Sequence, residues 1–306
     1  ATYPDYDLNT PFEPTEELQD GWDNLSSTEK SDALAKVWRN ICVSNTYEPG
    51  STYKIITAAV GLEENLVETD TKDDFMCTGY EMFPGNVKIG CWKTSSHGSQ
   101  TLREALENSC NPALMQLGKR IGASTLYKYY EAFGLFEKTG IETSGETKGI
   151  FFDLDKIGPV ELATMSFGQR ITVTPIQLIT AISAVANNGV LMQPRIVSKI
   201  ENADTGAVTV IEPKEVRQVI SKETASELCD MLESVVTDGT GKYGQVAGYS
   251  IAGKTGTSEP SPGNEDEGYV ASYVAFSPAE NAQVAILVTL YDPRGSSHQG
   301  GSVAGP

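Results

Sequence analysis

The chain has 306 residues, 39% of them hydrophobic, and a formal net charge of −18 at pH 7. This length allows one large domain or two small ones with an ample apolar core. The acidic excess argues against nucleic acid or an anionic membrane surface as a partner, because both would repel the chain. No apolar stretch is long enough to span a membrane, and the chain begins with Ala1, so we expect a piece of a protein whose anchor, if it has one, lies upstream.

The N-terminal part of the chain predicts two helices after an extended entry segment. Residues 1–14 are rich in tyrosine, proline and aspartate and carry little secondary-structure signal. Ser27 can cap a helix whose apolar residues fall on one face. Pro49 and Gly50 disfavour a helix interior, so the second helix begins at or just after Ser51 and continues as a buried apolar segment.

The middle of the chain alternates helices with irregular segments. Residues 62–98 are acidic and irregular, and residues 134–160 are glycine-rich and loop-like. A helical region begins at Thr101 and continues after Pro112. Another helix opens at Thr174 with a capping box and with proline at its first position, and it ends at an Asn-Asn-Gly stop.

The last third of the chain changes to the period of β-strands. Two short apolar runs joined by a turn predict a hairpin, and Ser221 begins one more helix. Residues 258–268 are acidic and rich in proline and glycine, which is typical of a solvated loop. The predicted strands are Ile196–Ile200, Val208–Ile211, Tyr249–Gly253, Tyr269–Phe276 and Val284–Tyr291.

Helices come first and antiparallel strands come late, without a regular alternation of strand and helix, and this order predicts an α+β fold. We expect a single domain over residues 1–306. Its helical lobe would occupy roughly residues 15–190 and its sheet lobe roughly residues 191–306, with the helices packed against the sheet.

Ser51 and Lys54 form a pair that can carry nucleophilic catalysis. They stand three residues apart at a predicted helix start, so both side chains share one face. A serine hydroxyl becomes a strong nucleophile only when a base takes its proton, and a desolvated lysine can be that base. The same spacing occurs at Ser27 and Lys30, where the polar setting favours a helix cap and a solvated lysine instead.

Two further polar clusters could complete such a site. Ser109-Cys110-Asn111 lies at a break between helical stretches, although a helix cap would explain this tripeptide equally well. Lys254-Thr255-Gly256 follows the apolar Ile251-Ala252-Gly253, and we expect it on a strand that faces another. A lysine and hydroxyls there suit a carboxylate, and a glycine lets a substrate backbone approach. The second Lys-Thr-Gly, at residues 138–140, lies in a polar loop and is more typical of a structural segment.

Taken in order, these three motifs resemble those of penicillin-binding proteins and serine β-lactamases. Longer stretches are similar to the class B penicillin-binding transpeptidases, and the resemblance covers nearly the whole chain. These stretches are Tyr47-Glu48-Pro49-Gly50-Ser51, Asn108-Ser109-Cys110-Asn111-Pro112, Met165-Ser166-Phe167-Gly168-Gln169 with Thr174-Pro175, and Ala252-Gly253-Lys254-Thr255-Gly256-Thr257. The resemblance implies the transpeptidase fold, in which helices flank an antiparallel sheet and an all-helical lobe is added.

The same resemblance implies a D,D-transpeptidase that cross-links peptidoglycan stem peptides and is acylated by β-lactams. In that family pattern Ser51 attacks the carbonyl of the penultimate D-Ala, and Lys54 acts as the base. Ser109 relays a proton to the leaving D-Ala. Asn111 holds the donor peptide, and Lys254 supplies positive potential.

The resemblance also assigns the third motif and the setting of the enzyme. Thr255 and Thr257, beside Gly256, would bind the terminal carboxylate, and the backbone N–H groups of Ser51 and Thr257 would form an oxyanion hole. We expect an enzyme at the extracytoplasmic face of the cell membrane, anchored by an N-terminal segment outside this chain, with a membrane glycosyltransferase as partner. The chemistry itself needs no cofactor.

Other activities share this acyl-enzyme chemistry. A class A β-lactamase needs a glutamate ahead of a Leu-Asn pair for deacylation, and that pattern is not found. A β-lactam sensor would resemble class D β-lactamases, which carry an apolar residue at the position of Asn111. The asparagine therefore argues against a sensor. A D,D-carboxypeptidase, which transfers the acyl group to water, stays open, whereas an idle structural domain is disfavoured by three intact motifs. Family domains carry sheet strands before the Tyr3-Pro4-Asp5 region, and a strand end and a helix after Gly300-Gly301, so we expect the sheet of this chain to be incomplete.

A cysteine–histidine segment precedes the second motif. Cys77, Cys91 and His97 lie close together in sequence, with Asp73 and Asp74 just upstream. Two thiolates, an imidazole and a carboxylate would complete a tetrahedral zinc shell, with Asp73, or Asp74 in its place, as the fourth ligand. The alternatives are a Cys77–Cys91 disulfide, which an extracytoplasmic setting favours, or two buried thiols.

The resemblance favours the metal. The pattern around these cysteines is similar to the spore-cortex and related transpeptidases of spore-forming Gram-positive bacteria, some of which bind zinc. Such an ion would be structural and would pin an irregular segment that leads into the second motif. The remaining cysteines, Cys42, Cys110 and Cys229, are expected to be small apolar residues of the interior, and His298 is expected to be solvated in its loop.

Overall fold

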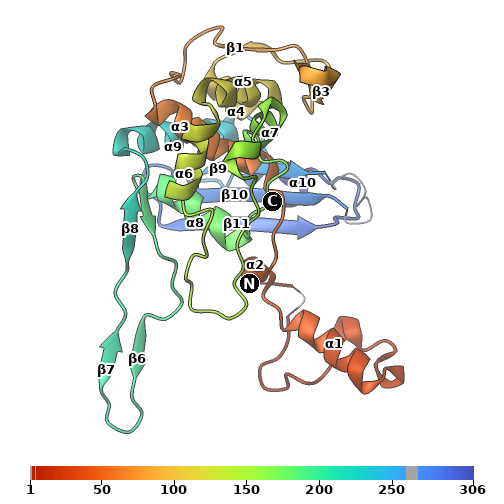
Figure 1. Ribbon diagram of the computed structural model, residues 1–306. Coiled ribbons are helices and arrows are strands. Elements are labelled where there is room, and N and C mark those ends of the chain that lie inside the picture. Colours follow the sequence, from red (N-terminus) through yellow and green to blue (C-terminus); the bar gives the residue numbers. More distant parts are fainter. Residues whose placement is uncertain (1, 4, 260–267) are drawn as a thin grey trace.

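In the computed structural model, which describes residues 2–3, 5–259 and 268–306, helices pack around a three-stranded antiparallel sheet (Figure 1). The strands follow the order β11-β10-β9, with β9 at Ala252–Ser258, β10 at Val270–Ser277 and β11 at Val284–Tyr291. In the register of this sheet Val274 of β10 faces Lys254 on β9 and Leu287 on β11. The α+β prediction is confirmed.

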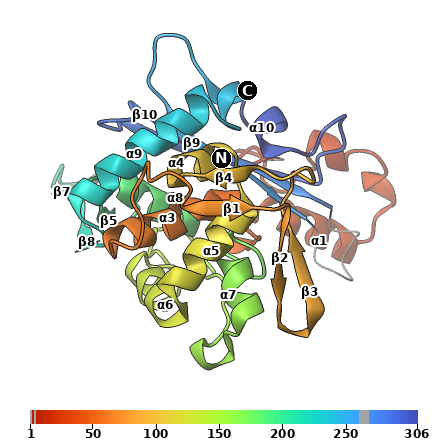
Figure 2. The same ribbon diagram turned by 90° about the horizontal axis from the view of Figure 1, so that it is seen from above.

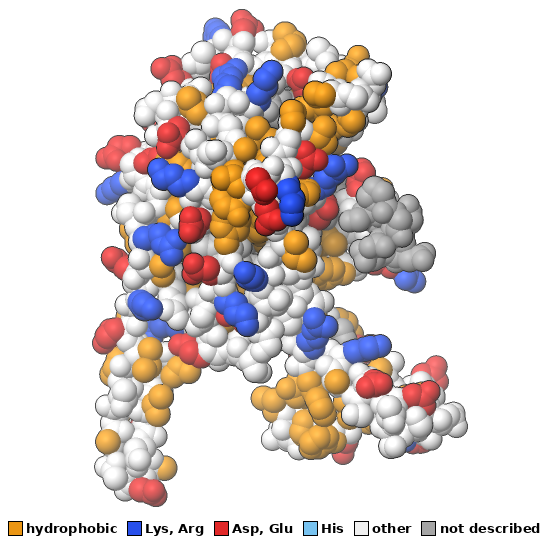
Figure 3. All heavy atoms as spheres, viewed as in Figure 1, with side chains coloured by type: hydrophobic (Ala, Val, Ile, Leu, Met, Phe, Trp, Pro, Cys, Tyr) orange, Lys and Arg blue, Asp and Glu red, His pale blue; other side chains and the backbone are white. Residues whose placement is uncertain are grey.

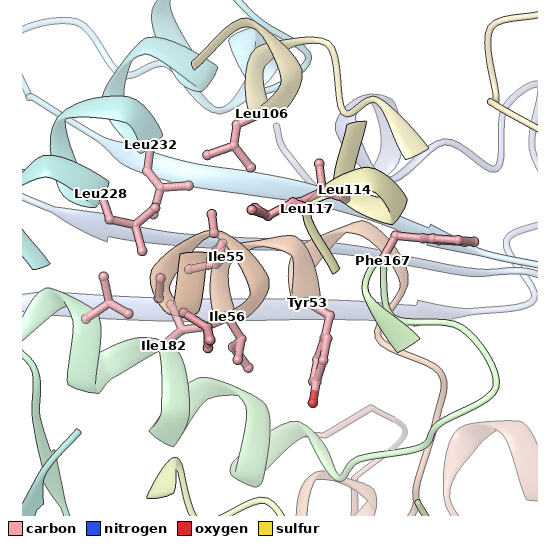
Figure 4. Close-up of a cluster of buried hydrophobic side chains, with 14 of the residues drawn as sticks. Tyr53, Ile55, Ile56, Leu106, Leu114, Leu117, Phe167, Ile182, Leu228 and Leu232 are labelled. Atoms are coloured by element: carbon pink, nitrogen blue, oxygen red, sulfur yellow. The ribbon is translucent and has the colours of Figure 1, made fainter. Parts of the chain in front are cut away.

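The helix α3, Lys54–Glu63, lies at the centre of the described structure. Every residue from Lys54 to Leu62 is buried, because the apolar run has no polar face to turn towards water. Figure 4 shows Ile55 and Ile56 among apolar side chains of other helices, including Ile182 and several leucines. The neighbouring helices are α5, Asn111–Ile121, and α9, Lys222–Thr237. Each fully buried leucine or isoleucine in such a core contributes about 1.5–3 kcal/mol.

The remaining elements are short. The helices are α1 (Ser27–Val37), α2 (Ile41–Ser44), α4 (Leu102–Glu107), α6 (Ala123–Ala132), α7 (Pro159–Met165), α8 (Pro175–Ala186) and α10 (Gly300–Val303). The strands are β1 (Phe75–Cys77), β2 (Tyr80–Phe83), β3 (Val87–Gly90), β4 (Gly98–Gln100), β5 (Val190–Met192), β6 (Lys199–Glu201), β7 (Val208–Val210) and β8 (Glu215–Gln218). Among the described residues no helix combines the length and the apolar character needed to cross a membrane.

Several predicted elements are confirmed, although the cap of the first helix lies one residue earlier than predicted. Ser26, one residue before the predicted cap, accepts from the Glu29 N–H and begins α1 with a capping box. Thr174 begins α8 with the predicted capping box, completed by Gln177. The predicted hairpin forms as β6 and β7 and projects away from the sheet, as does α1 on another side (Figure 1). Apolar side chains gather beside α1 on the projecting N-terminal part of the chain (Figure 3).

Two predicted segments differ. Residues 62–98, predicted to be irregular, contain three complete short strands and the start of a fourth; β1 pairs with β4 and β2 pairs with β3. Strands of three or four residues are too short to show an alternating pattern, which explains why the sequence did not reveal them. The strand predicted at Tyr249–Gly253 begins only at Ala252 and continues to Ser258. Of the predicted 258–268 loop, residues 260–267 lie outside the described residues.

Candidate active site

Ser51 lies in a tight turn that is pressed against the sheet. A 3₁₀ turn at Gly50–Tyr53 leads directly into α3, so the helical backbone begins one residue before Ser51. Gly50 has a left-handed φ of +54°, and its N–H donates to the Gly168 carbonyl at 2.9 Å. A Cβ on Gly50 would come within 2.9 Å of the Thr257 carbonyl oxygen on β9. Glycine therefore lets the turn that carries Ser51 lie directly against β9.

Lys54 is buried one turn after Ser51 and binds the second motif. Its ammonium group donates to the Ser109 carbonyl and to Asn111 Oδ1, both at 2.7 Å, and reaches Ser109 Oγ at 3.3 Å. Its side chain is fully excluded from solvent, and this burial lowers the pKa of Lys54 to about 8.

Lys254 reaches the same hydroxyl from the sheet. Its Nζ donates to Ser109 Oγ at 2.8 Å, and its side chain is also fully buried. Burial lowers the pKa of Lys254 well below its usual range, and the positive charge of Lys54 lowers it further. Ser109 has a left-handed φ of +50°, which a residue with a Cβ adopts only where its surroundings hold it there. The Ser109 hydroxyl therefore lies between two buried amines from different parts of the chain.

A groove of about 880 Å³ opens above these groups. Its lining includes Ser51, Ser109, Asn111, Thr255 and Thr257, which were all predicted site residues, while the two lysine amines lie beneath it and bind Ser109. The structure thus brings the three motifs together at one groove. Within the described residues the Ser51 hydroxyl has no hydrogen-bond partner, which leaves it free to face the groove.

The third motif lies on β9, as predicted, and is held in place from both sides. A Cβ on Gly256 would come within 2.3 Å of Ser272 Oγ and 2.9 Å of Thr52 Cγ2, so only glycine fits between β10 and the Ser51 turn. The Gly300 N–H donates to Thr257 Oγ1 at 3.0 Å. This contact fixes the hydroxyl of Thr257 at the edge of the groove.

The sequence did not predict that several other residues line the groove. Trp92 lines it, and so do Tyr269 and His298, whose rings stack with their centroids 3.9 Å apart. His298 is half-buried, although the sequence predicted a solvated loop residue. Isolated aromatic residues carry no local pattern that separates a groove wall from a core position, so the sequence offered no signal for them.

A compact cluster of thiols and one imidazole lies next to the second motif. Its members are Cys77, Cys91, His97 and Cys110, and one ligand atom from each lies within 4.8 Å of the others. His97 Nδ1 is 3.5 Å from Cys91 Sγ and 3.7 Å from Cys77 Sγ. All of these cysteines are free thiols, and three thiolates with one imidazole are a donor set that zinc binds tetrahedrally. The residues present therefore fit a structural zinc ion.

This cluster differs from the predicted ligand set at one position. Asp73 does not belong to it, because its carboxylate accepts from the Ser99 hydroxyl instead. Asp74 is bound on both carboxylate oxygens by Arg120, at 2.8 and 2.9 Å. Cys110, predicted to be an apolar interior residue, takes the fourth place. Because Cys110 lies inside the second motif, the sequence already placed it close to the candidate site. Only the fold shows that this motif contacts β1 and β3.

Comparisons with known proteins agree over most of the chain. The penicillin binding protein transpeptidase domain matches residues 4–306. Stage V sporulation protein D of Bacillus subtilis is 42% identical over 88% of this chain, and the peptidoglycan D,D-transpeptidase PbpA of Mycolicibacterium smegmatis is 30% identical over 94%. The chain spans only 42% and 57% of these two proteins.

Solved structures show the same similarity. Penicillin binding protein 3 of Mycobacterium tuberculosis, complexed with aztreonam, aligns with a TM-score of 0.78 and 28% identity. The aligned region covers 89% of this chain and 62% of the penicillin binding protein 3 chain. A D,D-transpeptidase domain from Eggerthella lenta aligns with a TM-score of 0.81 and 26% identity. Here the aligned region covers 99% of this chain and 72% of the Eggerthella chain.

The close contact beneath Ser51 leads to a first prediction. Gly168 has a φ of +82°, and a Cβ there would come within 2.2 Å of the Gly50 carbonyl oxygen. We expect Gly168→Ala to lower the free energy of unfolding by about 1–2 kcal/mol from backbone strain and by about 1–3 kcal/mol more from the clash. Thermal or urea unfolding measures this loss.

Gly206→Ala is the matched control. Gly206 also has a left-handed φ, +66°, but a Cβ there would meet nothing within 4 Å. Gly206→Ala should therefore lower the free energy of unfolding only by the strain contribution. Equal losses for the two variants would contradict a packed contact between Gly168 and the Ser51 turn.

Proposed function

Because this chain belongs to the penicillin-binding protein transpeptidase family, we propose that it is the catalytic domain of a peptidoglycan D,D-transpeptidase. The observation that carries this proposal is the Ser109 hydroxyl, which accepts from both Lys54 and Lys254 beside the groove that Ser51 lines. The matched relatives extend well beyond this chain, so the activity of the whole protein is part of the proposal.

Acylation begins at Ser51. Its Oγ attacks the carbonyl carbon of the penultimate D-Ala, and its proton passes to the neutral amine of Lys54. Burial makes that neutral amine available near neutral pH. The backbone N–H groups of Ser51 and Thr257 stabilise the oxyanion of the tetrahedral intermediate. The peptide C–N bond then breaks, and the leaving D-Ala takes up a proton through Ser109.

The other groups bind the donor peptide. When Lys54 is neutral, its charge no longer lowers the pKa of Lys254, and Lys254 supplies positive potential in its protonated form. The hydroxyls of Thr255 and Thr257 bind the terminal carboxylate, which approaches closely because Gly256 has no side chain. Asn111 is oriented on both sides of its amide, since Oδ1 accepts from Lys54 and Nδ2 donates to the Gly90 carbonyl at 3.2 Å. An amine of a second stem peptide then attacks the ester, which forms the cross-link and releases Ser51.

We also propose that zinc stabilises this domain, with Cys77, Cys91, His97 and Cys110 as ligands. The donor set and its spacing support this assignment. A bound zinc ion would add the stability of four ligand bonds to this part of the fold. Because Cys110 stands between Ser109 and Asn111, its position would then be tied to β1 and β3.

The setting of the enzyme is likewise a proposal. We place the domain at the extracytoplasmic face of the cell membrane, anchored by a segment outside this chain and working with a membrane glycosyltransferase. A role in sporulation is supported by the similarity to stage V sporulation protein D. The similarity to a penicillin binding protein solved with aztreonam supports the proposal that β-lactams bind this domain.

Benzylpenicillin tests the nucleophile. The β-lactam ring opens without a leaving group, so Ser51 should gain the whole mass of one penicillin, measured by intact-mass spectrometry. Ser51→Ala should gain none. Ser27→Ala, which changes the other Ser-x-x-Lys, should be acylated like the wild type. An adduct on Ser51→Ala would exclude the proposed nucleophile.

The acceptor distinguishes related activities. When a D-amino acid amine is supplied with a donor peptide, a transpeptidase forms the exchanged peptide. Hydrolysis alone, with no exchanged product by mass spectrometry, would identify a D,D-carboxypeptidase instead.

The pH dependence tests the base. Lys54 can take the proton only when neutral, and its pKa is lowered to about 8. Below this pH the neutral fraction falls, so the rate of acylation by benzylpenicillin should fall about tenfold per pH unit and should level off above the pKa. A rate that stays constant between about pH 6 and 9 would exclude Lys54 as the base. Unfolding curves at each pH control for loss of the fold.

Metal analysis tests the zinc site. The purified chain should hold one zinc ion, and a chelator should lower its melting temperature. Cys110→Ala should lose the ion, whereas Asp73→Asn should keep it, and Cys229→Ala controls for the loss of a buried thiol elsewhere. Zinc retained in Cys110→Ala and lost in Asp73→Asn would restore the predicted ligand set. A Cys77–Cys91 disulfide found by mass spectrometry would rule out the site.

A further inference from the structure

The β6–β7 hairpin projects from the domain with both of its strands exposed. Figure 2 shows β7 beside β5 and β8, on the opposite side from the β2–β3 hairpin, whose strand β3 lines the groove. Every residue of β6 and β7 is exposed, and Ile200, Val208 and Val210 keep 58%, 52% and 59% of their surface in water. Two strands alone are marginally stable in water, so this hairpin would gain stability from a further strand.

The backbone of β6 has a free edge on the side away from β7. The Ser198 carbonyl accepts from the Ile211 N–H at 2.9 Å, and the backbone of Asn202 also bonds across the hairpin. Residues of an antiparallel pair alternate between bonded and non-bonded positions. The peptide groups of Lys199 and Glu201 therefore point away from β7 and can bond to another strand.

The side chains on this edge are arranged to complement a second copy of the chain. Lys199 and Glu201 lie on either side of Ile200 and share one face, with their charged atoms 3.7 Å apart. When two copies of β6 pair antiparallel about Ile200, each lysine lies opposite the glutamate of the other copy. A register centred on either charged residue would place like charges opposite each other, which is destabilising. The strand β7 reads Val-Thr-Val and has no charge that could select a register.

We propose that two copies of this chain associate through β6, in antiparallel register about Ile200. The product is a four-stranded sheet in the order β7-β6-β6-β7. The contact is isologous, because the same residues meet on both copies. It forms two cross-strand ion pairs on one face and brings the two isoleucines together on the other. The strands are short and bury a small area, so the expected Kd is about 0.1 mM.

The position of the hairpin allows this contact between two acidic chains. Each copy carries a net charge of −18, so two domains repel each other when they come close. Because the hairpin projects from the domain (Figure 1), two antiparallel hairpins can pair while the domains lie at opposite ends of the new sheet. No residue of β6 or β7 lines the groove, so association needs no change at the candidate active site.

Charge exchange tests the register. In sedimentation velocity up to about 1 mM protein, the wild type should show a monomer–dimer equilibrium. Lys199→Glu and Glu201→Lys should each raise the Kd about tenfold, because each places like charges opposite each other at two positions. The double variant Lys199→Glu/Glu201→Lys restores opposite charges and should recover the wild-type Kd. Lys156→Glu makes the same change in net charge as Lys199→Glu, in an exposed ion pair elsewhere, and should keep the wild-type Kd.

A disulfide tests which strand makes the contact. In the proposed sheet the two copies of Ile200 form a non-hydrogen-bonded pair with Cα atoms about 4.5 Å apart, which a disulfide can span. Ile200→Cys should therefore give a covalent dimer on oxidation. Thr209→Cys is the matched control, because Thr209 pairs with Ile200 within the hairpin. Its two copies would lie three strand spacings apart, about 14 Å, which is too far for a disulfide. The wild type measures the background from the native thiols.

Three results would overturn the proposal. A wild type that stays monomeric at about 1 mM would leave the edge of β6 to a strand of a different protein. A dimer whose Kd the single charge variants leave unchanged would exclude the register. A covalent dimer from Thr209→Cys and none from Ile200→Cys would place the contact on β7. Thermal unfolding of each variant should match that of the wild type, because the exchanged side chains are exposed.

Discussion

Two buried amines share one hydroxyl, and this interaction depends on every major part of the structure. Lys54 comes from the central helix α3, Lys254 from β9, and Ser109 from the turn between α4 and α5. Two lysines this close repel each other if both are charged, and burial adds a further cost for each charge. The arrangement therefore favours a neutral amine, which is the state that can accept a proton.

The interaction is possible because backbones approach closely around it. Gly50 and Gly256 let the Ser51 turn and β9 meet without side chains between them, and Gly168 supports the turn from behind. Ser109 adopts a left-handed conformation that brings its hydroxyl between the amines. Any side chain added at these glycines would move Ser51 relative to Lys254, so the packing of the fold and the geometry of the site depend on the same contacts.

The second motif is held from both sides. Lys54 binds it from within the core. On the groove side Gly90, the last residue of β3, accepts from Asn111, and Trp92, which lies beyond the end of β3, donates to Asn108 beside the motif. The thiol cluster lies on the β3 side, with Cys110 inside the motif itself. One short turn thus connects the interior of the domain, the candidate metal site and the groove.

The sequence by itself determined what depends on neighbouring residues. The capping box of α8, the hairpin of β6 and β7, and the spacing that places Ser51 and Lys54 one turn apart all follow from local backbone preferences. The family motifs also named several of the residues that line the groove, among them Ser51, Ser109 and Thr257. Only the tertiary structure decided that Ser109 lies between two lysines and that Cys110, rather than Asp73, joins the thiol cluster. Such contacts join residues far apart in the chain, and they depend on how the helices pack on the sheet, which no local pattern encodes.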